Sequence, residues 1–504
     1  MAELHISSLD WRQLLLLGAA LPLVYGIYTV IYNLFFHPLR SYPGPLLNRA
    51  SQIPFALMLM RGKPSWEVME LHKKYGDVVR IGPGELAYAD PQAWKDMMGH
   101  RKSTHPENVK DLRYVDLPFG PDIVNSERDD HRRYRRILAH GFSSQFLMDQ
   151  QPLIMSHVDN LIAQLRKRAP GSNPFDMTAW YNFTTFDIIA DLTFGKPFGL
   201  LDAGEYHPWV SAIFGSLKAS IFVRCANFFP PLKKAVQLFS PKKAVMQRLE
   251  HIQYVKDKVS DRLELGSKRP DYMDTILTHR EKETGGMNRT EIDANANVLI
   301  IAGSETTATT LSGATYLCLT NPRVLDKVVA EVRSSFKTDE EIDIQSASKL
   351  EYMLAMFDET MRVYPPVPTT NFRRTPPEGD VICGKFVPKD TSMSIWQLAL
   401  YRDPRNFKNP NQFVPERWLG DPEYEGDVKE AFNPFHLGPR ACLGRNLAYA
   451  EMRVIFAKML FNFDMKLADE SQDWMDQNMY VVWEKNTLKV HLIPREIGKT
   501  IEQA

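Results

Sequence analysis

Near its C-terminus the chain reads Phe435-His436-Leu437-Gly438-Pro439-Arg440-Ala441-Cys442-Leu443-Gly444, a run in which one cysteine stands among glycines and a cation. Gly438 and Gly444 let the backbone approach a flat ligand or adopt a positive φ, and Arg440 offers a charge to an anionic group. Cys442 is expected just before a helix N-terminus, where the helix dipole lowers a thiol pKa and favours a metal-binding thiolate. An isolated cysteine is more often buried and inert, so this prediction depends on the whole run. The helix is predicted from apolar residues at helical spacing, which are Ala448, Met452, Ile455, Phe456, Met459 and Leu460.

A long helical pattern lies upstream of this run. It begins near Thr290, where Thr290-x-x-Asp293 is a candidate capping box, and continues toward Leu319. Inside it lies Ala302-Gly303-Ser304-Glu305-Thr306-Thr307. Glycine inside a helix costs about 1 kcal/mol relative to alanine, and threonine hydroxyls can bond to carbonyls of the preceding turn. The hexapeptide therefore predicts a local distortion that makes room for a ligand, with close helix packing through small residues as the alternative.

The run at 435–444 matches, position for position, the haem-binding loop FxxGxRxCxG, and on these residues the chain resembles the cytochrome P-450 family. Further family motifs follow in the family's order, so the resemblance covers essentially the whole chain. It implies the cytochrome P-450 fold, mainly α with a small β subdomain. It also implies a haem b cofactor whose iron takes the Cys442 thiolate as its axial ligand. Within the loop, cofactor contacts are expected from Phe435, Gly438, Arg440 and Gly444.

The hexapeptide at 302–307 resembles the family's oxygen-binding helix, with its AGx(D/E)T segment. The resemblance implies that Ala302 and Gly303 face the haem. It further implies that Thr306 and Glu305 are catalytic residues, which deliver protons during dioxygen activation. In this interpretation Glu305 connects Thr306 to solvent.

Basic residues at two other places match family positions. His131 and Arg135, at i and i+4, match (W/H)xxxR, and Arg373 occupies a second position at which family members bind a haem propionate. The resemblance therefore implies that these three side chains hold the propionates. The remaining cations of the cluster are predicted to face an acidic electron donor on the Cys442 side of the haem; they are Arg132, Arg133, Arg136 and Arg445.

Glu359 and Arg362 lie three residues apart on one predicted helix face. Pairs with this spacing are usually surface salt bridges. The following segment Phe413-Val414-Pro415-Glu416-Arg417-Trp418 resembles another family motif. Taken together, these residues are expected to form a charge triad of Glu359, Arg362 and Arg417 whose role is structural.

Composition limits the class of protein. The 504 residues include 61 Lys plus Arg and 61 Asp plus Glu, so the balance of charge gives no indication of nucleic-acid binding. The 4 cysteines are far apart and predict neither a disulfide framework nor a zinc site, which favours a reducing compartment. Short strands are predicted at 78–81, 85–89, 381–387 and 393–396, and most other segments have helical spacing.

The N-terminal region predicts one membrane span. Residues 14–36 contain no charged side chain and could cross roughly 30 Å of hydrocarbon as a helix; a cleaved signal peptide is the alternative. Positive charges that follow the span place the C-terminal part in the cytosol. We therefore expect a lumenal segment 1–13, a transmembrane anchor 14–36, a Pro-rich hinge 37–50 and a haem-binding catalytic domain 51–504. The predicted location is the endoplasmic reticulum membrane, in a single-pass topology.

The resemblance implies a haem-thiolate monooxygenase that inserts one oxygen atom from dioxygen into a lipophilic substrate, by hydroxylation or epoxidation. Electrons are expected from an NADPH-dependent cytochrome P-450 reductase, with cytochrome b5 as an optional second donor. The stretches 37–45 and 80–96 look like those of filamentous-fungal enzymes that oxidise polyketides, terpenoids or alkaloids in secondary metabolism. The expected cavity walls are 111–125, 300–302, 367–371 and 480–483.

Three alternatives remain open at this point. A haem-thiolate isomerase or dehydratase would act on a peroxide and need no NADPH, so activity retained in Thr306→Ala without a reductase would favour it. A xenobiotic or fatty-acid hydroxylase would share the site and differ in substrate. A non-enzymatic haem carrier or sensor would have no use for a proton relay.

Overall fold

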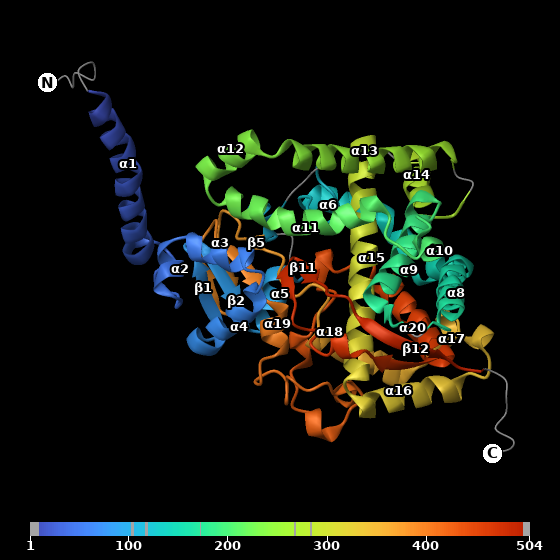
Figure 1. Ribbon diagram of the computed structural model, residues 1–504. Helices are drawn as coiled ribbons and strands as arrows, with labels where there is room; N and C mark the ends of the chain where they lie inside the picture. The colour runs from blue at the N-terminus through green and yellow to red at the C-terminus, as the bar shows by residue number, and fades with distance from the viewer. Residues whose placement is uncertain are drawn as a thin grey trace.

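The computed structural model describes residues 10–101, 105–115, 119–171, 173–266, 269–282 and 285–496, and within these ranges the chain is mostly helical. The long helix α15 runs through the middle of the body, and the N-terminal strands lie to one side of it (Figure 1). The helices are α1 (Trp11–Ile31), α2 (Leu46–Ala50), α3 (Ile53–Met60), α4 (Pro64–Tyr75), α5 (Gln92–Met98), α6 (Arg128–Leu138), α7 (Ser144–Asp149), α8 (Gln151–Arg168), α9 (Met177–Phe194), α10 (Leu200–Ala203), α11 (Pro208–Asn227), α12 (Pro230–Phe239), α13 (Lys242–Glu264), α14 (Tyr272–Lys282), α15 (Arg289–Leu319), α16 (Pro322–Ser335), α17 (Ile344–Ala347), α18 (Glu351–Val363), α19 (Gln397–Tyr401) and α20 (Arg445–Asn462).

The strands form four small sheets. One has five strands in the order β1-β2-β8-β5-β3, in which the β2–β8 pair is parallel and the other pairs are antiparallel. The others are the three-stranded sheet β4-β12-β9 and the hairpins β6–β7 and β10–β11. All four predicted strand regions are confirmed, and 381–387 is divided between the two strands of a hairpin. The strands are β1 (Val78–Gly82), β2 (Glu85–Tyr88), β3 (Val109–Lys110), β4 (Phe175–Asp176), β5 (Arg373–Arg374), β6 (Asp380–Ile382), β7 (Lys385–Val387), β8 (Ser392–Ile395), β9 (Phe463–Leu467), β10 (Asn478–Tyr480), β11 (Val482–Glu484) and β12 (Lys489–Pro494).

The core is built around α15 and α9. Every residue of α9 is buried, which is expected of a helix enclosed on all sides. Close approach of the two helices depends on a small residue, because a Cβ on Gly303 would lie 2.7 Å from Ile189 Cδ1. The helix predicted after Cys442 is confirmed as α20, and most of the apolar side chains that predicted it belong to the same core.

The N-cap of α15 lies two residues before the predicted one. Asn288, not Thr290, forms the capping box: its side chain accepts from the Glu291 N–H over 3.0 Å, and the Glu291 carboxylate accepts from the Asn288 N–H over 2.8 Å. The proposed partner of Thr290, Asp293, pairs instead with Arg289 at 2.8 Å. The extent of the helix to Leu319 is confirmed, and α15 is assigned as one continuous α-helix through 302–307.

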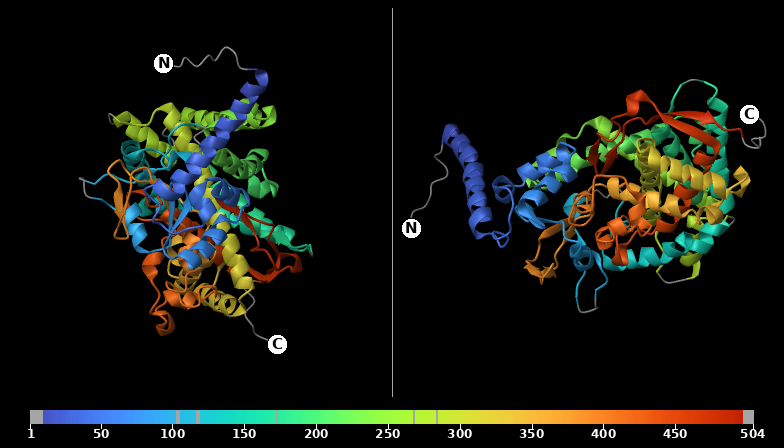
Figure 2. Two further views of the ribbon diagram at one scale, coloured as in Figure 1. Left: turned by 90° about the vertical axis from the view of Figure 1, so that its left-hand side faces the viewer. Right: turned by 90° about the horizontal axis from the view of Figure 1, so that it is seen from below.

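The N-terminal helix α1 stands away from the body in three views (Figures 1 and 2). It continues into a short π-helical segment, Tyr32–Phe36, and large apolar side chains remain exposed along it, Leu21 and Tyr25 among them. In the described part of the chain the helix that is long and apolar enough to cross a membrane is α11, while Ala20–Phe36 is apolar but shorter. An apolar N-terminal helix is thus present, and its insertion in a membrane stays a prediction.

Residues 43–50, at the end of the predicted hinge, are attached to the body. The Arg80 N–H donates to the Pro43 carbonyl over 2.7 Å, and Asn48 donates to the Ile81 carbonyl over 2.9 Å. Gly44 is needed here, because a Cβ would lie 2.3 Å from the Arg80 carbonyl oxygen. The segment therefore fixes α1 relative to β1.

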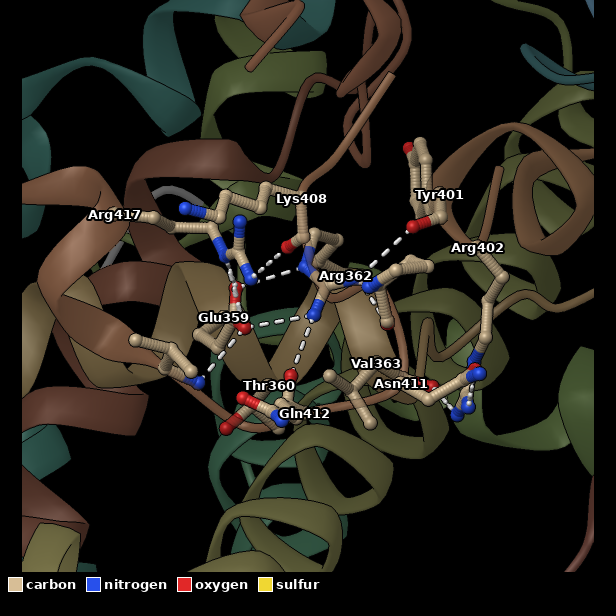
Figure 3. Close-up of polar contacts among 12 residues, drawn as sticks. Glu359, Thr360, Arg362, Val363, Tyr401, Arg402, Lys408, Asn411, Gln412 and Arg417 are labelled. Atoms are coloured by element: carbon tan, nitrogen blue, oxygen red, sulfur yellow. Dashed lines mark hydrogen bonds and ion pairs between the residues drawn. The ribbon is translucent and has the colours of Figure 1, made fainter. Parts of the chain in front are cut away.

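The predicted charge triad is present and fully buried (Figure 3). Arg362 donates to both carboxylate oxygens of Glu359, over 2.7 and 2.9 Å, and Arg417 donates to the same carboxylate over 3.1 Å. Arg417 also pairs with Asp427. The Arg362 guanidinium further donates to the carbonyls of Tyr401, Pro410 and Gln412, so α18 is tied to the segment that leads to the Cys442 loop.

Candidate active site

The loop that carries Cys442 is closed by a backbone hydrogen bond and shaped by one glycine. The Cys442 N–H donates to the Phe435 carbonyl over 2.8 Å, so the loop folds back before α20 begins at Arg445. Gly438 has φ +76°, and a Cβ on it would lie 1.9 Å from the Met98 carbonyl oxygen at the end of α5. A side chain at this position is therefore excluded both by backbone conformation and by space.

Gly444 is used differently from Gly438. Its φ is −81°, and a Cβ on it would meet Phe142 at 3.9 Å, an ordinary contact. Of the two uses expected for these glycines, a positive φ is therefore confirmed at Gly438 only. Gly444 lines the cavity beside Cys442, where the missing side chain leaves space for a flat ligand.

Cys442 lines the cavity and is exposed to it, although burial among the surrounding protein atoms also acts on its thiol. This burial raises the pKa of the thiol above its ordinary value, although the Gly444 N–H and the charges of Arg135 and Arg445 act in the opposite direction. The expected lowering by a nearby N–H group and by positive charge is thus present, but in the protein alone desolvation outweighs it. A coordinating metal ion deprotonates a thiol outright, so the metal itself would supply the missing stabilisation.

A cavity of about 270 Å³ lies between this loop and α15. It brings together the predicted site residues with two exceptions, Glu305 and Gly438. A larger groove of about 960 Å³ lies at the far end of the molecule, between α8 and β12, and contains none of them. The predicted residues that line the cavity are Ala302, Gly303, Thr306, His131, Arg135, Arg373, Phe435, Arg440, Cys442 and Gly444.

Part of the cavity wall is formed by α15. The Thr306 hydroxyl donates to the Ala302 carbonyl over 2.7 Å, which is the bond to the preceding turn that its position predicted. Gly303 also lines the cavity, but its contact with Ile189 shows that it serves helix packing as well. The predicted local distortion is not found, because α15 is assigned as α-helix throughout this segment. Close packing through small residues is confirmed at Gly303, and the same segment also lines the cavity.

Glu305 lies on another side of α15. Its carboxylate pairs with Lys485 Nζ at 2.5 Å, and the Thr309 hydroxyl donates to the same oxygen over 3.4 Å. The second carboxylate oxygen is buried and has no hydrogen-bond partner among the described residues. Glu305 and Lys485 line a second cavity of about 410 Å³, which also contains Tyr480 and Trp483. The predicted substrate wall 480–483 thus lies here and not at Cys442, and the role of Glu305 in proton delivery stays a prediction.

A cluster of cations lies at one edge of the Cys442 cavity. Strands β3 and β5 pair so that Lys110 is directly opposite Arg373. Like charges in this arrangement repel each other. Burial, and then the nearby Arg440, lower the pKa of Arg373 to about 9, and its Nη1 has no hydrogen-bond partner among the described residues. Such a cluster is suited to an anionic group, so its residues fit the carboxylates of a haem.

Arg440 and Arg135 hold the loop to its surroundings. Arg440 pairs with Glu107 and donates to the Ser126 carbonyl over 2.9 Å. Arg135 donates to the Ala441 carbonyl, next to Cys442, over 2.6 Å. Both side chains also line the cavity, so they can contact a cofactor from positions that the protein has already fixed.

His131 is buried and its pKa is lowered to about 4, first by burial and then by the charges of Arg440 and Arg135. This value applies to the protein without an anion beside the ring, and an adjacent propionate would raise the pKa again. The predicted contact of His131 with a propionate stays a prediction. Burial and the charges of Arg373 and Lys110 likewise lower the pKa of His436, to about 3.

The structure adds three residues that the sequence did not single out. Lys110 lines the cavity, His436 packs at 5.0 Å from Trp94 and lies 3.4 Å from the Asn371 amide, and Glu107 pairs with Arg440. Lys110 is found only through the pairing of β3 with β5, which no local pattern reveals. His436 lies within the quoted run, and its φ of +57° marks it as a special position.

Arg133, one of the cations predicted to contact an electron donor, forms ion pairs within the protein. Arg133 pairs with Glu291 at 2.6 Å and with Asp130 at 2.7 Å, so its charge serves to tie α6 to the start of α15. Arg132 is exposed on the same helix. The docking surface for an electron donor stays a prediction, and Arg133 is no longer counted among its residues.

Comparison with known proteins agrees with this site. The family model described as Cytochrome P-450 matches residues 44–492. The cytochrome P-450 monooxygenase astA of Talaromyces wortmannii is 44% identical over 97% of this chain and 99% of its own length. The trichothecene C-15 hydroxylase of Fusarium sporotrichioides is 42% identical over 96% and 98%. The averantin hydroxylase of Dothistroma septosporum is 41% identical over 96% and 92%. The chain belongs to the cytochrome P-450 family, whose members hold a haem iron through an axial cysteine thiolate.

Proposed function

We propose that this protein is a monooxygenase of fungal secondary metabolism, which hydroxylates or epoxidises a lipophilic polyketide, terpenoid or alkaloid. The observation that carries the proposal is that Cys442 and Thr306, from two distant segments of the chain, line one cavity. The names of the relatives support the reaction class, because two of them are hydroxylases, of a trichothecene and of averantin.

Different residues of the cavity would bind the cofactor and the substrate. A bound haem would supply the activation of dioxygen. Cys442 would give the axial thiolate, and Arg135, Arg373 and Arg440 would hold the propionates. Apolar side chains such as Val298, Val367 and Ile123 would exclude water and bind a lipophilic molecule.

Proton supply would run across α15. The Thr306 hydroxyl faces the cavity, whereas Glu305 faces the second cavity, whose lining includes the exposed ion pair of Lys218 and Glu484. Solvent would reach Glu305 from that side, and Thr306 would present a proton at its Oγ1 on the other. For this relay the carboxylate must move away from Lys485, which holds it in the present arrangement.

The apolar helix α1 and the basic residues after it support an anchor in the endoplasmic reticulum membrane, with the catalytic domain in the cytosol. An NADPH-dependent cytochrome P-450 reductase in the same membrane would supply electrons, with cytochrome b5 as an optional second donor. Arg132 and Arg445, both exposed, are candidates for contact with an acidic donor.

The experiment compares metabolites of source cells with and without the gene, and then feeds the accumulated compound to membranes that contain the protein, the reductase and NADPH. We expect a product with one additional oxygen atom, derived from labelled dioxygen. Cys442→Ser should abolish the reaction and the red-shifted Soret band of the reduced CO complex. Thr306→Ala should keep that band while NADPH is consumed with little product. Conversion without NADPH or added oxygen would overturn the proposal in favour of an isomerase.

A further inference from the structure

Glu107 occupies an unusual place among the cations at the edge of the Cys442 cavity. Its carboxylate pairs with Arg440 Nε, and the exposed fractions of the two side chains are only 21% and 8%. Arg440 Nη1 donates to the Ser126 carbonyl over 2.9 Å, and its Nη2 makes no hydrogen bond to a described residue. Arg440 is thus held on two nitrogens by the protein, with a third left for the cavity that it lines.

The charge of Glu107 reaches several other members of the cluster. Lys110 and Arg373 are cross-strand neighbours. Burial lowers the pKa of both, and so do nearby positive charges, those of Arg373 and Arg440 for Lys110 and that of Arg440 for Arg373. Glu107 acts in the opposite direction on each of them, and on His131. One carboxylate therefore offsets part of a positive field that is shared by at least three cations.

We propose that Glu107 sets the reduction potential of the haem by cancelling part of the positive charge that Arg440, Arg373 and Lys110 direct at it. The inference rests on the proposed function, since it requires a haem bound through Cys442. Glu107 is a positioning and tuning residue that acts through Arg440 and does not touch the reacting atoms.

The direction of the effect follows from charge. The reductase transfers one electron to the ferric haem, and the ferrous product carries one positive charge less. A nearby carboxylate favours the more positive ferric form and so lowers the potential. Within the protein interior this interaction is weakly screened, whereas that of an exposed charge is reduced strongly by salt.

The test is a spectroelectrochemical titration of the full-length, haem-loaded protein. Glu107→Gln and Glu107→Ser both remove the charge but differ in hydrogen bonding. We expect both to shift the ferric–ferrous potential to more positive values by similar amounts, and Glu107→Asp to keep the wild-type potential. The control is Asp129→Asn, which removes one charge from an exposed position in the first turn of α6. Its shift should be smaller and should vanish at high salt, whereas the Glu107 shift should persist.

The outcomes separate this inference from the proposed function. A wild-type protein that binds haem with the thiolate spectrum, and variants whose potential equals that of Asp129→Asn at every salt concentration, would overturn the inference alone. A shift in Glu107→Ser that is absent in Glu107→Gln would also overturn it, because the cause would then be lost packing and not charge. A wild-type protein without the thiolate spectrum would overturn the proposed function, and this inference with it.

Discussion

Two groups of buried charges differ in whether the protein supplies their counter-charges. In the triad region, two carboxylates, Glu359 and Asp427, face two guanidinium groups, Arg362 and Arg417. At the cavity edge, Lys110 and Arg373 lie opposite each other, and one guanidinium nitrogen of Arg373 is without a partner among the described residues. Buried polar groups are usually satisfied. A balanced cluster therefore indicates a structural role, and an unbalanced one indicates a missing anion.

The largest effect is expected from breaking the balanced cluster. Glu359→Gln leaves Arg362 and Arg417 buried without their shared carboxylate, and loss of one partner of a buried pair costs about 3–5 kcal/mol. We expect a large decrease in the free energy of unfolding, measured by urea titration, and a low yield of protein containing haem. Glu351→Gln, on an exposed position of the same helix, is the matched control. Near-normal stability of Glu359→Gln would show that the triad is not the support of the loop.

The second prediction concerns the cluster at the cavity edge. Loss of one of its charges should not destabilise the protein without haem, but it should weaken the binding of haem. Arg373→Met removes one of two like charges, so the protein without haem should be as stable as the wild type or more stable. Haem retention should decrease, since a charge-assisted hydrogen bond contributes about 1.5–3 kcal/mol. Transfer of haem to an acceptor protein should then be at least about tenfold faster. If Arg373→Met instead destabilised the protein without haem, the cluster would be structural like the triad.

The smallest effect is a pH dependence confined to the cavity. The pKa of His131 is about 4 in the folded protein without haem and about 6.5 when unfolded, so the unfolded chain binds more protons between these values. Stability should therefore rise with pH in this window and decrease on acidification. Between pH 6.5 and 5.5 the loss is about 1 kcal/mol. His131→Gln should remove that part of the slope, whereas His140→Gln, at an exposed position, should leave it unchanged.

The parts of the site that could be predicted are those encoded in contiguous residues. The loop 435–444 contains the proposed metal ligand Cys442 and the glycine at 438, and α20 follows it directly, so its geometry is largely local. The pair Glu359 and Arg362 is likewise fixed by helical spacing. By contrast, the cap of α15 was misplaced because two overlapping sequences, at 288–291 and 290–293, both satisfy the pattern of a capping box.

What could not be predicted depends on contacts between distant segments. Glu305 and Thr306 are adjacent in sequence, but consecutive positions on a helix point about 100° apart, and only the packing of α15 decides which faces Cys442. Lys485 reaches Glu305 from 180 positions away. The pairing of Lys110 with Arg373 depends on strand register, and the desolvation that raises the pKa of Cys442 depends on the surrounding fold.

The parallel pairing of β2 with β8 has a consequence for synthesis of the chain. Ser394 donates to the Leu86 carbonyl across 308 positions, so the five-stranded sheet cannot be completed until both segments have left the ribosome. At about 5–20 residues per second, β2 waits roughly 15–60 s for its neighbour. Throughout that interval a nascent chain exposes one open strand edge, and unpaired strand edges promote aggregation of incompletely folded chains.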